Sequence, residues 1–354
     1  MSHVRFPTTV IGSLPRPAWV RDVILDRKAG RLTETDADGL LDPAIDTAIR
    51  LQERAGLDEI TDGEWRRESY VKVFAERVRG FRPDVNPSGG LPHPAVVAPI
   101  EYHREIAAQE VRYARARTGR RVKATLPAPY IIGRRMWHAE HSRAAYPTRE
   151  GLMRDCVGVL RREIEAVRAA GADTVQLDEP WLATLVDPKF RAEEGIADVR
   201  YEMDLCADLL NQTLDGLRGI ETSVHLCHAH FARRHRTEGS YDLIMPALAR
   251  VRTGTISLEL ATPVAGGLAT LAHFPATPRL GLGCIDHCER RVETVDEVVA
   301  RVEAAMRYVD GERIVLHPDC GFAPSVQNPM DLDEAYEKLK VMGQAAARLR
   351  ERHA

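Results

Sequence analysis

The alternation of strand-like and helix-like segments is the feature that most constrains the fold of this chain. Short apolar runs of β type recur from one end to the other, and longer segments separate them. The eight runs are 8–13, 57–64, 122–129, 174–180, 222–228, 255–260, 279–284 and 313–321. Strand and helix repeated to a count of eight is typical of a (β/α)8 barrel. The sequence therefore predicts an α/β protein with a TIM barrel.

The later intervening segments carry apolar residues at helical spacing. They are 149–170, 202–217, 294–309 and 331–349. The alternative fold is an open, doubly wound parallel sheet. The count of eight runs and the missing glycine-rich dinucleotide loop both argue against that alternative.

The length of 354 residues lies within the range of one large α/β barrel, so we expect a single barrel domain over 1–354. Residues 81–121, which begin FRPDVNPSGGLPHP, do not fit a simple strand–helix unit. We expect them to form an excursion, a hairpin or a lid, inserted between the second and third strands.

Charge and hydropathy exclude several classes of partner. The net charge is −3 and the arginines are dispersed, which gives no basic patch for nucleic acid. No stretch approaches the roughly 20 uninterrupted apolar residues of a membrane span. The start of the chain lacks a signal-peptide pattern and the six cysteines lie far apart, so we expect reduced thiols and a cytoplasmic location.

Nearly every predicted strand ends in polar residues. Examples are Asp-Gly-Glu at 62–64, His-Leu-Cys-His at 225–228 and Pro-Asp-Cys-Gly at 318–321. Polar groups at the ends of core strands cost free energy unless they are paired or bind something. The carboxyl ends of the strands form the active site of a TIM barrel, so we expect the site there.

Four of these strand-end residues have the chemistry of metal ligands. His225 and Cys227 are two apart on one strand and point to the same side. Glu259 ends the next strand and Cys320 ends the last. One imidazole, two thiolates and a carboxylate match tetrahedral zinc. Three strong ligands and one exchangeable carboxylate predict a catalytic Zn²⁺ rather than a structural one.

The charge of this ligand set indicates the reaction type. Two thiolates and one carboxylate leave a zinc site at about −1, which makes the metal a poor Lewis acid toward a carbonyl. A coordinated thiol is nevertheless deprotonated and stays nucleophilic. The set therefore favours alkylation of a thiol over hydrolysis.

Other readings of the same residue types stay open. A single cysteine is most often a small buried hydrophobe. Cys284, His287 and Cys288, in CIDHC, form a rival ligand cluster at the seventh strand end. The segment HAHFARRH, residues 228–235, adds three histidines and two arginines, which form either part of a donor site or a solvated loop.

With these residues in place, the chain resembles the catalytic half of cobalamin-independent methionine synthase, and more closely its short, single-barrel relatives. The similarity runs through nearly the whole chain. VQLDEP alone is not specific, but HxC followed by PDCG in this order is. The motifs are VIGSLPRP at 10–17, TDGEWRRESYVKVF at 61–74, VQLDEP at 175–180, HLC at 225–227, SLEL at 257–260 and HPDCGF at 317–322.

The resemblance implies residue roles. It makes His225, Cys227, Glu259 and Cys320 the zinc ligands, and it assigns an amino-acid pocket to Ile11, Gly12, Ser13, Glu64 and Asp178. The chemistry agrees, because a free amino acid needs amides or hydroxyls for its carboxylate and carboxylates for its ammonium. For Glu64 and Asp178 the alternative is a salt bridge to Arg66, Arg67 or another barrel arginine.

The chain also departs from the family pattern. The second, N-terminal barrel of the full synthase is absent, which leaves binding of polyglutamylated folate open. The family's proton-donating histidine lies in a YDIH-like segment, where this chain has CIDHCE. Cys288 takes the aligned position, His287 stands one residue earlier and Asp286 is retained. We predict Asp286 and His287 as the catalytic pair.

The leading hypothesis is that homocysteine, activated as a zinc-bound thiolate, is methylated to methionine by a methylfolate or methylcorrinoid donor. The alternative is alkyl transfer to another small thiol, similar to epoxyalkane:coenzyme M transferase. A sulfonate acceptor would favour arginines at the positions of Glu64 and Asp178. A third hypothesis is a thiol-binding or chaperone-like protein with structural zinc. A decarboxylase without zinc is the fourth, but it would not need His225, Cys227 and Cys320 together.

Overall fold

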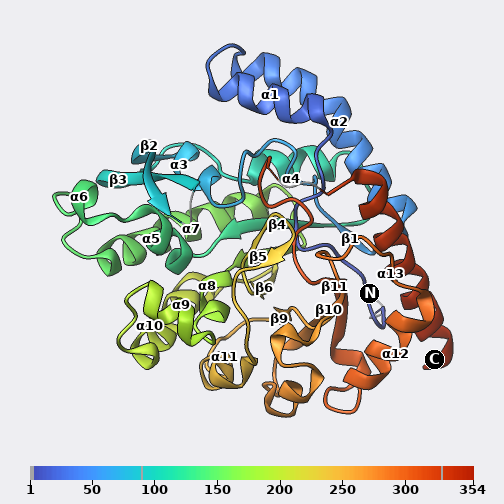
Figure 1. The fold of residues 1–354 in the computed structure, drawn as a ribbon. Helices are drawn as coiled ribbons and strands as arrows, with labels where there is room; N and C mark the ends of the chain where they lie inside the picture. Colours follow the sequence, from blue (N-terminus) through green and yellow to red (C-terminus); the bar gives the residue numbers. More distant parts are fainter. Residues whose placement is uncertain (1–3, 89–90, 328–329) are drawn as a thin grey trace.

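The computed structural model describes residues 4–88, 91–327 and 330–354. Its centre is a curled sheet of seven parallel strands in the order β1-β4-β5-β6-β9-β10-β11 (Figure 1). The strands are β1 (Glu59–Ile60), β4 (Arg121–Pro127), β5 (Thr174–Asp178), β6 (Glu221–Leu226), β9 (Thr255–Leu258), β10 (Arg279–Ile285) and β11 (Ile314–Pro318). The predicted α/β class is confirmed.

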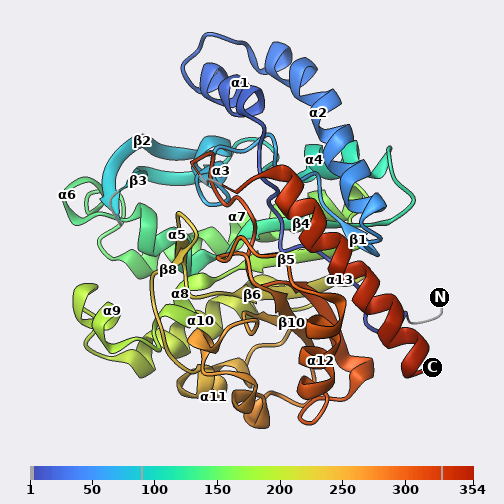
Figure 2. The same cartoon turned by 45° about the vertical axis from the view of Figure 1, so that its right-hand side comes forward.

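Helices cover the outside of the sheet (Figures 1 and 2). The α-helices are α1 (Ala18–Lys28), α2 (Glu34–Arg54), α3 (Lys72–Arg77), α4 (Ala108–Arg115), α5 (Pro129–Met136), α6 (Ala139–Ser142), α7 (Arg149–Ala169), α8 (Pro180–Thr184), α9 (Pro188–Glu193), α10 (Val199–Leu214), α11 (Met245–Leu248), α12 (Val295–Ala305) and α13 (Leu332–Arg352). Short 3₁₀ helices are η1 (Tyr241–Leu243), η2 (Pro263–Ala265), η3 (Leu268–His273) and η4 (Gly311–Arg313). The four predicted helical segments correspond to α7, α10, α12 and α13.

Six of the eight predicted strands form as expected, from 122–129 onward. Strands β4 and β5 show why apolar runs in the sequence predicted these strands correctly. All five residues of β5 are buried, as are six of the seven in β4. A parallel strand that is covered on both faces reads as a nearly continuous apolar run.

The first two predicted strands differ from expectation. The run 57–64 contributes only the two residues of β1 to the sheet, because the chain turns at Gly63 and Glu64, which both have positive φ. The run 8–13 forms no named strand. It makes a single parallel bridge, from Thr8 to Leu316. In the described residues the predicted eight strands are therefore seven.

The segment around Thr8 nevertheless joins the two edges of the sheet. The amide of Leu316 in β11 donates to the carbonyl of Pro7 (2.8 Å), and the amide of Thr9 donates back to the Leu316 carbonyl (2.9 Å). On the other side, the amide of Glu59 in β1 donates to the carbonyl of Thr8 (3.1 Å). This short stretch of chain lies between β11 and β1 and bonds to both.

The predicted excursion contains an antiparallel hairpin. Strands β2 (Val78–Ser88) and β3 (Leu91–Tyr102) pair from Val78 opposite Tyr102, and they lie between β1 and β4 in the chain. The hairpin begins three residues before the predicted range, and α4 follows it. Residues 89–90 of the range lie outside the described residues. His93 of β3 lines a cavity at the carboxyl end of the sheet, so the hairpin forms part of the wall of that cavity.

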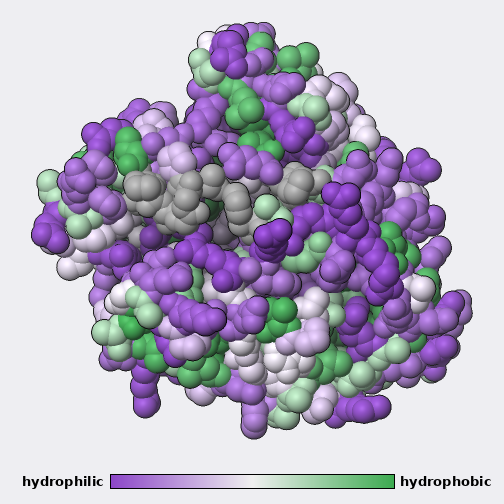
Figure 3. Space-filling view, viewed as in Figure 1, coloured by the Kyte–Doolittle hydropathy of each residue, from purple (hydrophilic) through white to green (hydrophobic). Residues whose placement is uncertain are grey.

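The surface shown in Figure 3 mixes polar and apolar side chains, and the apolar ones lie in small groups among the polar ones. Across the described ranges, no helix has the length and apolar character that a membrane span needs.

Candidate metal centre

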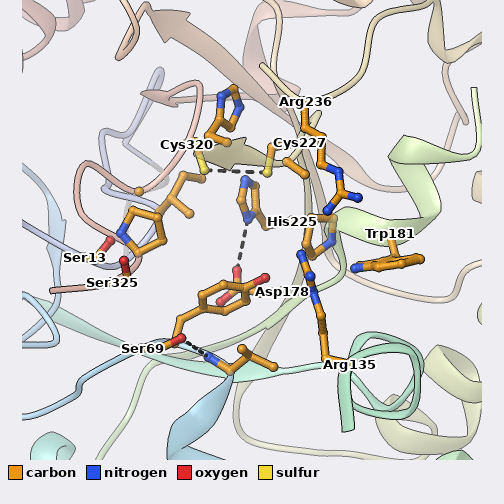
Figure 4. Close-up of a pocket in the computed structure, with 18 of the residues that line it drawn as sticks. Ser13, Ser69, Arg135, Asp178, Trp181, His225, Cys227, Arg236, Cys320 and Ser325 are labelled. Atoms are coloured by element: carbon orange, nitrogen blue, oxygen red, sulfur yellow. Dashed lines mark hydrogen bonds and ion pairs between the residues drawn. The ribbon is translucent and has the colours of Figure 1, made fainter. Parts of the chain in front are cut away.

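Three of the four predicted ligands converge at the carboxyl end of the sheet. His225 lies on β6, Cys227 directly follows it, and Cys320 follows β11. Their ligand atoms all lie within 4.8 Å of one another, and all three side chains are buried. The two Sγ atoms are 3.6 Å apart (Figure 4). We call these three residues the strand-end cluster.

His225 is oriented by Asp178, which lies opposite it on β5. Its Nδ1 is 3.0 Å from Asp178 Oδ1 (Figure 4). Its Nε2 is buried and has no hydrogen-bond partner among the described residues. A buried polar atom without a partner is costly, and a carboxylate on one ring nitrogen is the usual support for a histidine whose other nitrogen binds a metal. One imidazole and two thiols fit zinc.

The charges in the cluster favour a cation. The hydrogen bond that the Cys320 thiol donates to Cys227, together with His225, holds the pKa of Cys227 well below its usual range, although burial opposes this. The same thiolate raises the pKa of Cys320 well above its usual range. Burial lowers the pKa of His225, but the Cys227 thiolate and Asp178 outweigh it and raise that pKa to about 10. A metal ion would take the place of these retained protons.

Glu259, the fourth predicted ligand, lies outside the strand-end cluster. It directly follows β9 and is fully buried. Its Oε2 accepts from the amide of His228 (3.0 Å) and lies 2.9 Å from His230 Nε2, while its Oε1 is 2.8 Å from His235 Nδ1. To reach a metal at the strand-end cluster, this carboxylate would have to leave these contacts.

A cavity of about 470 Å³ opens above the strand-end cluster. Its lining joins the cluster to most of the predicted amino-acid pocket, namely Ile11, Ser13, Glu64 and Asp178. Gly12 supports the pocket from behind, because a Cβ there would lie 2.3 Å from Glu64 Oε1. Ser13 Oγ accepts from the amide of Ala323, which ties the 11–13 turn to the chain after Cys320.

Glu64 occupies a strained position in this pocket. Its φ is +57°, which a non-glycine residue rarely adopts outside functional sites. Thr125 Oγ1 donates to its Oε1 (2.8 Å), and its Oε2 is buried without a hydrogen-bond partner in the part of the chain described. Arg67 lies 3.8 Å away but pairs more closely with Glu110, at 2.5 Å. Glu64 therefore has a weak ion pair with Arg67, whose main partner is Glu110.

Several further residues that line the cavity were not foreseen. They are Tyr70, His93, Arg135, Trp181, Arg234 and Arg236. The Arg135 guanidinium lies 5.3 Å from the centre of the Trp181 ring (Figure 4). Arg234 belongs to the conspicuous HAHFARRH segment, but nothing in the pattern around Arg135 indicated a site.

The two predicted catalytic residues lie in different surroundings. His287 is buried, and its ring nitrogen falls within 4.8 Å of the ligand atoms of Cys320 and His230. Burial holds the pKa of His287 well below its usual range, which keeps the ring neutral. Asp286 Oδ1 accepts from the amide of Cys288 (2.7 Å) and so stabilises its own turn.

The HAHFARRH segment forms a second cluster. Strands β7 (His230–Phe231) and β8 (Arg234–His235) pair as a small hairpin, and the side chains of His228 and His230 are 0% and 2% exposed. The interpretation as a solvated loop is therefore wrong for these histidines. Of the rival cysteines, Cys288 lies with His230 and His235, whereas Cys284 is buried in β10.

Comparison with known proteins identifies the family of this chain. The family of the cobalamin-independent synthase catalytic domain matches residues 6–348. The chain belongs to the cobalamin-independent methionine synthase family. The resemblance inferred from the sequence motifs is thereby confirmed.

Within this family, the methionine synthase of Sulfolobus acidocaldarius is 30% identical over 89% of this chain and 85% of its own length. That of Saccharolobus solfataricus is 29% identical over 98% and 95%. The solved structure of a B12-independent methionine synthase from Shewanella sp. W3-18-1, in complex with selenomethionine, superposes with a TM-score of 0.80 at 22% identity, covering 98% of both chains. A putative vitamin-B12-independent methionine synthase from Listeria monocytogenes gives 0.73 at 19% identity, covering 96% of both. These two structures share the fold.

Proposed function

We propose that this protein transfers a methyl group to the sulfur of homocysteine and so produces methionine. The observation that carries the proposal is that one cavity contains both the strand-end cluster and the carboxylates Glu64 and Asp178. A thiol amino acid could place its sulfur at the cluster and its ammonium at the carboxylates. The names of the relatives, methionine synthases, agree with this substrate.

We propose zinc as the metal, held by His225, Cys227 and Cys320, with Glu259 as the exchangeable fourth ligand. When bound, zinc lowers the pKa of a coordinated thiol, so that homocysteine reacts as a thiolate at neutral pH. Two features of the protein would support metal binding. Both cysteines are buried, and Asp178 orients His225. Glu259 would have to exchange its contacts with His228 and His230 for this role.

The amino-acid pocket has a role for each predicted residue. The carboxylates of Glu64 and Asp178 would receive the ammonium group. Glu64 Oε2, which has no hydrogen-bond partner among the described residues, is available for this contact. Ser13 Oγ and the backbone of Ile11 and Gly12 would bind the carboxylate. Because Glu64 and Asp178 are buried, they would act with little screening by water.

We propose His287 as the proton donor, supported by Asp286 through the turn that they share. The position of His287 near Cys320 supports this role. Its neutral ring can pass a proton only if another group returns one. His230, whose ring centre lies 4.0 Å away, and Cys288, whose Sγ lies 3.7 Å from His287 Nε2, are the neighbouring groups that could do so.

We also propose that the chain closes as one (β/α)8 barrel over 1–354, with the β2–β3 hairpin as the insertion. The backbone bonds of Pro7, Thr8 and Thr9 to β11 and β1 support closure by an eighth strand-like segment. In a closed barrel the site lies at the carboxyl ends of the strands, where His225 and Cys320 are.

The test has two readouts on the zinc-loaded protein. Methionine should form from homocysteine with methyltetrahydrofolate or methylcobalamin. Homocysteine binding at neutral pH should release close to one proton per chain, since a free thiol has a pKa of about 8.5. Cys320→Ser should lose both signals, while Cys206→Ser, which changes a buried cysteine in α10, should keep them. Absence of methionine with both donors would refute the proposal.

A second candidate is alkyl transfer to another small thiol that carries an anionic group. It is favoured by Arg135, Arg234 and Arg236, which line the same cavity as Glu64 and Asp178. The discriminating experiment is a thiol screen by proton release. A sulfonate thiol that outcompetes homocysteine would favour this candidate, and homocysteine as the tightest thiol would exclude it.

A further inference from the structure

A second group of metal-binding side chains lies beside the strand-end cluster. His230 and His235 come from the β7–β8 hairpin, and Cys288 comes from the turn after β10. Their ligand atoms lie within 4.8 Å of one another. The two histidine side chains are only 2% and 15% exposed. We call these three residues the hairpin cluster.

One buried carboxylate supports both histidines of the hairpin cluster. Glu259 Oε2 lies 2.9 Å from His230 Nε2, and its Oε1 lies 2.8 Å from His235 Nδ1. The other ring nitrogen of His230, Nδ1, lies 3.7 Å from Cys288 Sγ, and His235 also contacts that thiol. His230 is therefore held at one nitrogen by a carboxylate and directed at a sulfur. His235 lies at ion-pair distance from the same carboxylate, without an aligned hydrogen bond to it. The arrangement at His230 is the one that presents a histidine to a metal, and it repeats that of Asp178 and His225.

The backbone of the hairpin gives independent support. Ala229, Ala232 and Arg233 all have φ between +48° and +64°, a conformation that non-glycine residues keep only where their surroundings impose it. Arg233 donates to the carbonyl of Cys288 (3.1 Å) and pairs with Glu334 (2.6 Å). The strained hairpin is thus fixed to the turn that carries the cluster's cysteine.

We propose that His230, His235 and Cys288 bind a second zinc ion, distinct from the one proposed at the strand-end cluster. Two imidazoles and one thiolate are a ligand set that tetrahedral zinc accepts, with its fourth position left for water or another ligand. The ion would fasten the hairpin to the turn after β10. Because Arg234 and Arg236 of this hairpin line the cavity, it would also fix that wall of the cavity.

The first test counts zinc. The full chain is loaded with zinc, freed of weakly bound ions by a mild chelator, and measured for metal per chain. The wild type should hold two zinc ions. Cys288→Ala and His235→Gln should each hold one ion, at the strand-end cluster. Cys227→Ala should also hold one ion, at the hairpin cluster. The matched control Cys284→Ala, a buried cysteine four residues before Cys288, should hold two. One ion in the wild type, or two in both hairpin-cluster variants, would overturn the proposal.

The second test does not depend on counting. Trypsin can cleave the hairpin after Arg233, Arg234 or Arg236 when the hairpin detaches from the rest of the protein. Zinc should slow cleavage there at least tenfold in the wild type and in Cys227→Ala, because the second ion fastens the hairpin. It should have no such effect in Cys288→Ala or His235→Gln. Equal zinc protection in all four proteins would contradict a site at the hairpin cluster.

Discussion

The strand-end cluster and the hairpin cluster use the same chemistry on different supports. Each places imidazole nitrogen and thiol sulfur within 4.8 Å. Each also has a buried carboxylate hydrogen-bonded to a histidine, Asp178 to His225 in one and Glu259 to His230 in the other. The residues of the strand-end cluster lie on β6, directly after β6 and two residues after β11, and ladder hydrogen bonds fix the positions of both strands. The hairpin cluster stands on two-residue strands and turns.

This difference separates two ways of building a ligand set. Strand ends hold ligands by the geometry of the sheet, which costs no unusual backbone conformation. A turn can hold ligands only if its own conformation is imposed, as the left-handed residues Ala229, Ala232 and Arg233 indicate. We expect the strand-end cluster to keep its shape without metal, and the hairpin cluster to depend on it.

The largest expected effect tests the functional side of the comparison. Cys320→Ser should lower methionine formation by about a thousandfold or more, since removing a ligand removes the activation of the thiol. The melting temperature of the metal-free protein should change little, because the residue follows a strand that stays in place. Activity is measured by methionine formation and folding by thermal denaturation. Collapse of the fold would instead make the strand-end cluster structural.

The next effect comes from the two carboxylates. Asp178→Asn should weaken zinc binding at the strand-end cluster by about 10–100-fold, and Glu259→Gln should do the same at the hairpin cluster. Zinc affinities are measured by chelator competition, in Cys288→Ala and Cys227→Ala backgrounds so that each cluster is tested alone. The exchangeable-ligand role proposed for Glu259 adds a second expectation, a smaller loss of affinity at the strand-end cluster. A loss at the strand-end cluster alone would show that Glu259 does not support the hairpin cluster.

A smaller effect is expected at the amino-acid pocket, which belongs to the strand-end side. Gly12→Ala would place a methyl 2.3 Å from Glu64 Oε1 and push that carboxylate toward the cavity. We expect KM for homocysteine to rise about tenfold, which corresponds to a loss of roughly 1.4 kcal/mol of binding free energy, with a smaller change in kcat. Gly158→Ala, in α7 and with nothing within 4 Å of the new Cβ, is the control and should leave KM unchanged. An unchanged KM in Gly12→Ala would exclude Glu64 from the pocket.

The smallest effect concerns hairpin strain. Ala232 is exposed at φ +50°, so Ala232→Gly relieves a cost of about 1 kcal/mol and should leave stability unchanged or raise it by up to ~1 kcal/mol. Ala192→Gly, on the exposed side of α9, should lower stability by about 0.5–1 kcal/mol. Both are measured by urea denaturation without metal. Equal losses in the two variants would show that the hairpin carries no strain.

The same comparison explains what could be predicted from the sequence. The convergence of His225, Cys227 and Cys320 follows from alternation along a strand and from the common end of parallel strands, both of which are readable. The contact of His230 with His235 depends on a turn of alanine and arginine residues, for which no sequence preference predicts left-handed backbone. The place of Glu259 depended on that turn, so it could not be predicted from strand order alone.

The fold shows the same limit. The buried runs of β4 and β5 were readable because sheets with two covered faces need apolar strands. The run 8–13 is also fully buried, but its backbone turns away after Thr9 to form the pocket at Ile11 and Ser13. Local pattern does not distinguish a strand from an extended segment that lines a site.

The backbone bonds that join the segment around Thr8 to β11 and β1 affect the order in which the chain folds. Pro7 and Thr9 bond to Leu316, and Arg350 in α13 donates to the carbonyls of Arg5 and Phe6. The first residues of the sheet thus have no complete set of partners until residues more than 300 positions later have docked. Contacts between such distant parts of a chain form slowly and late. We therefore expect the sheet to assemble from β4 to β11 first, and the two edges to join in the last step.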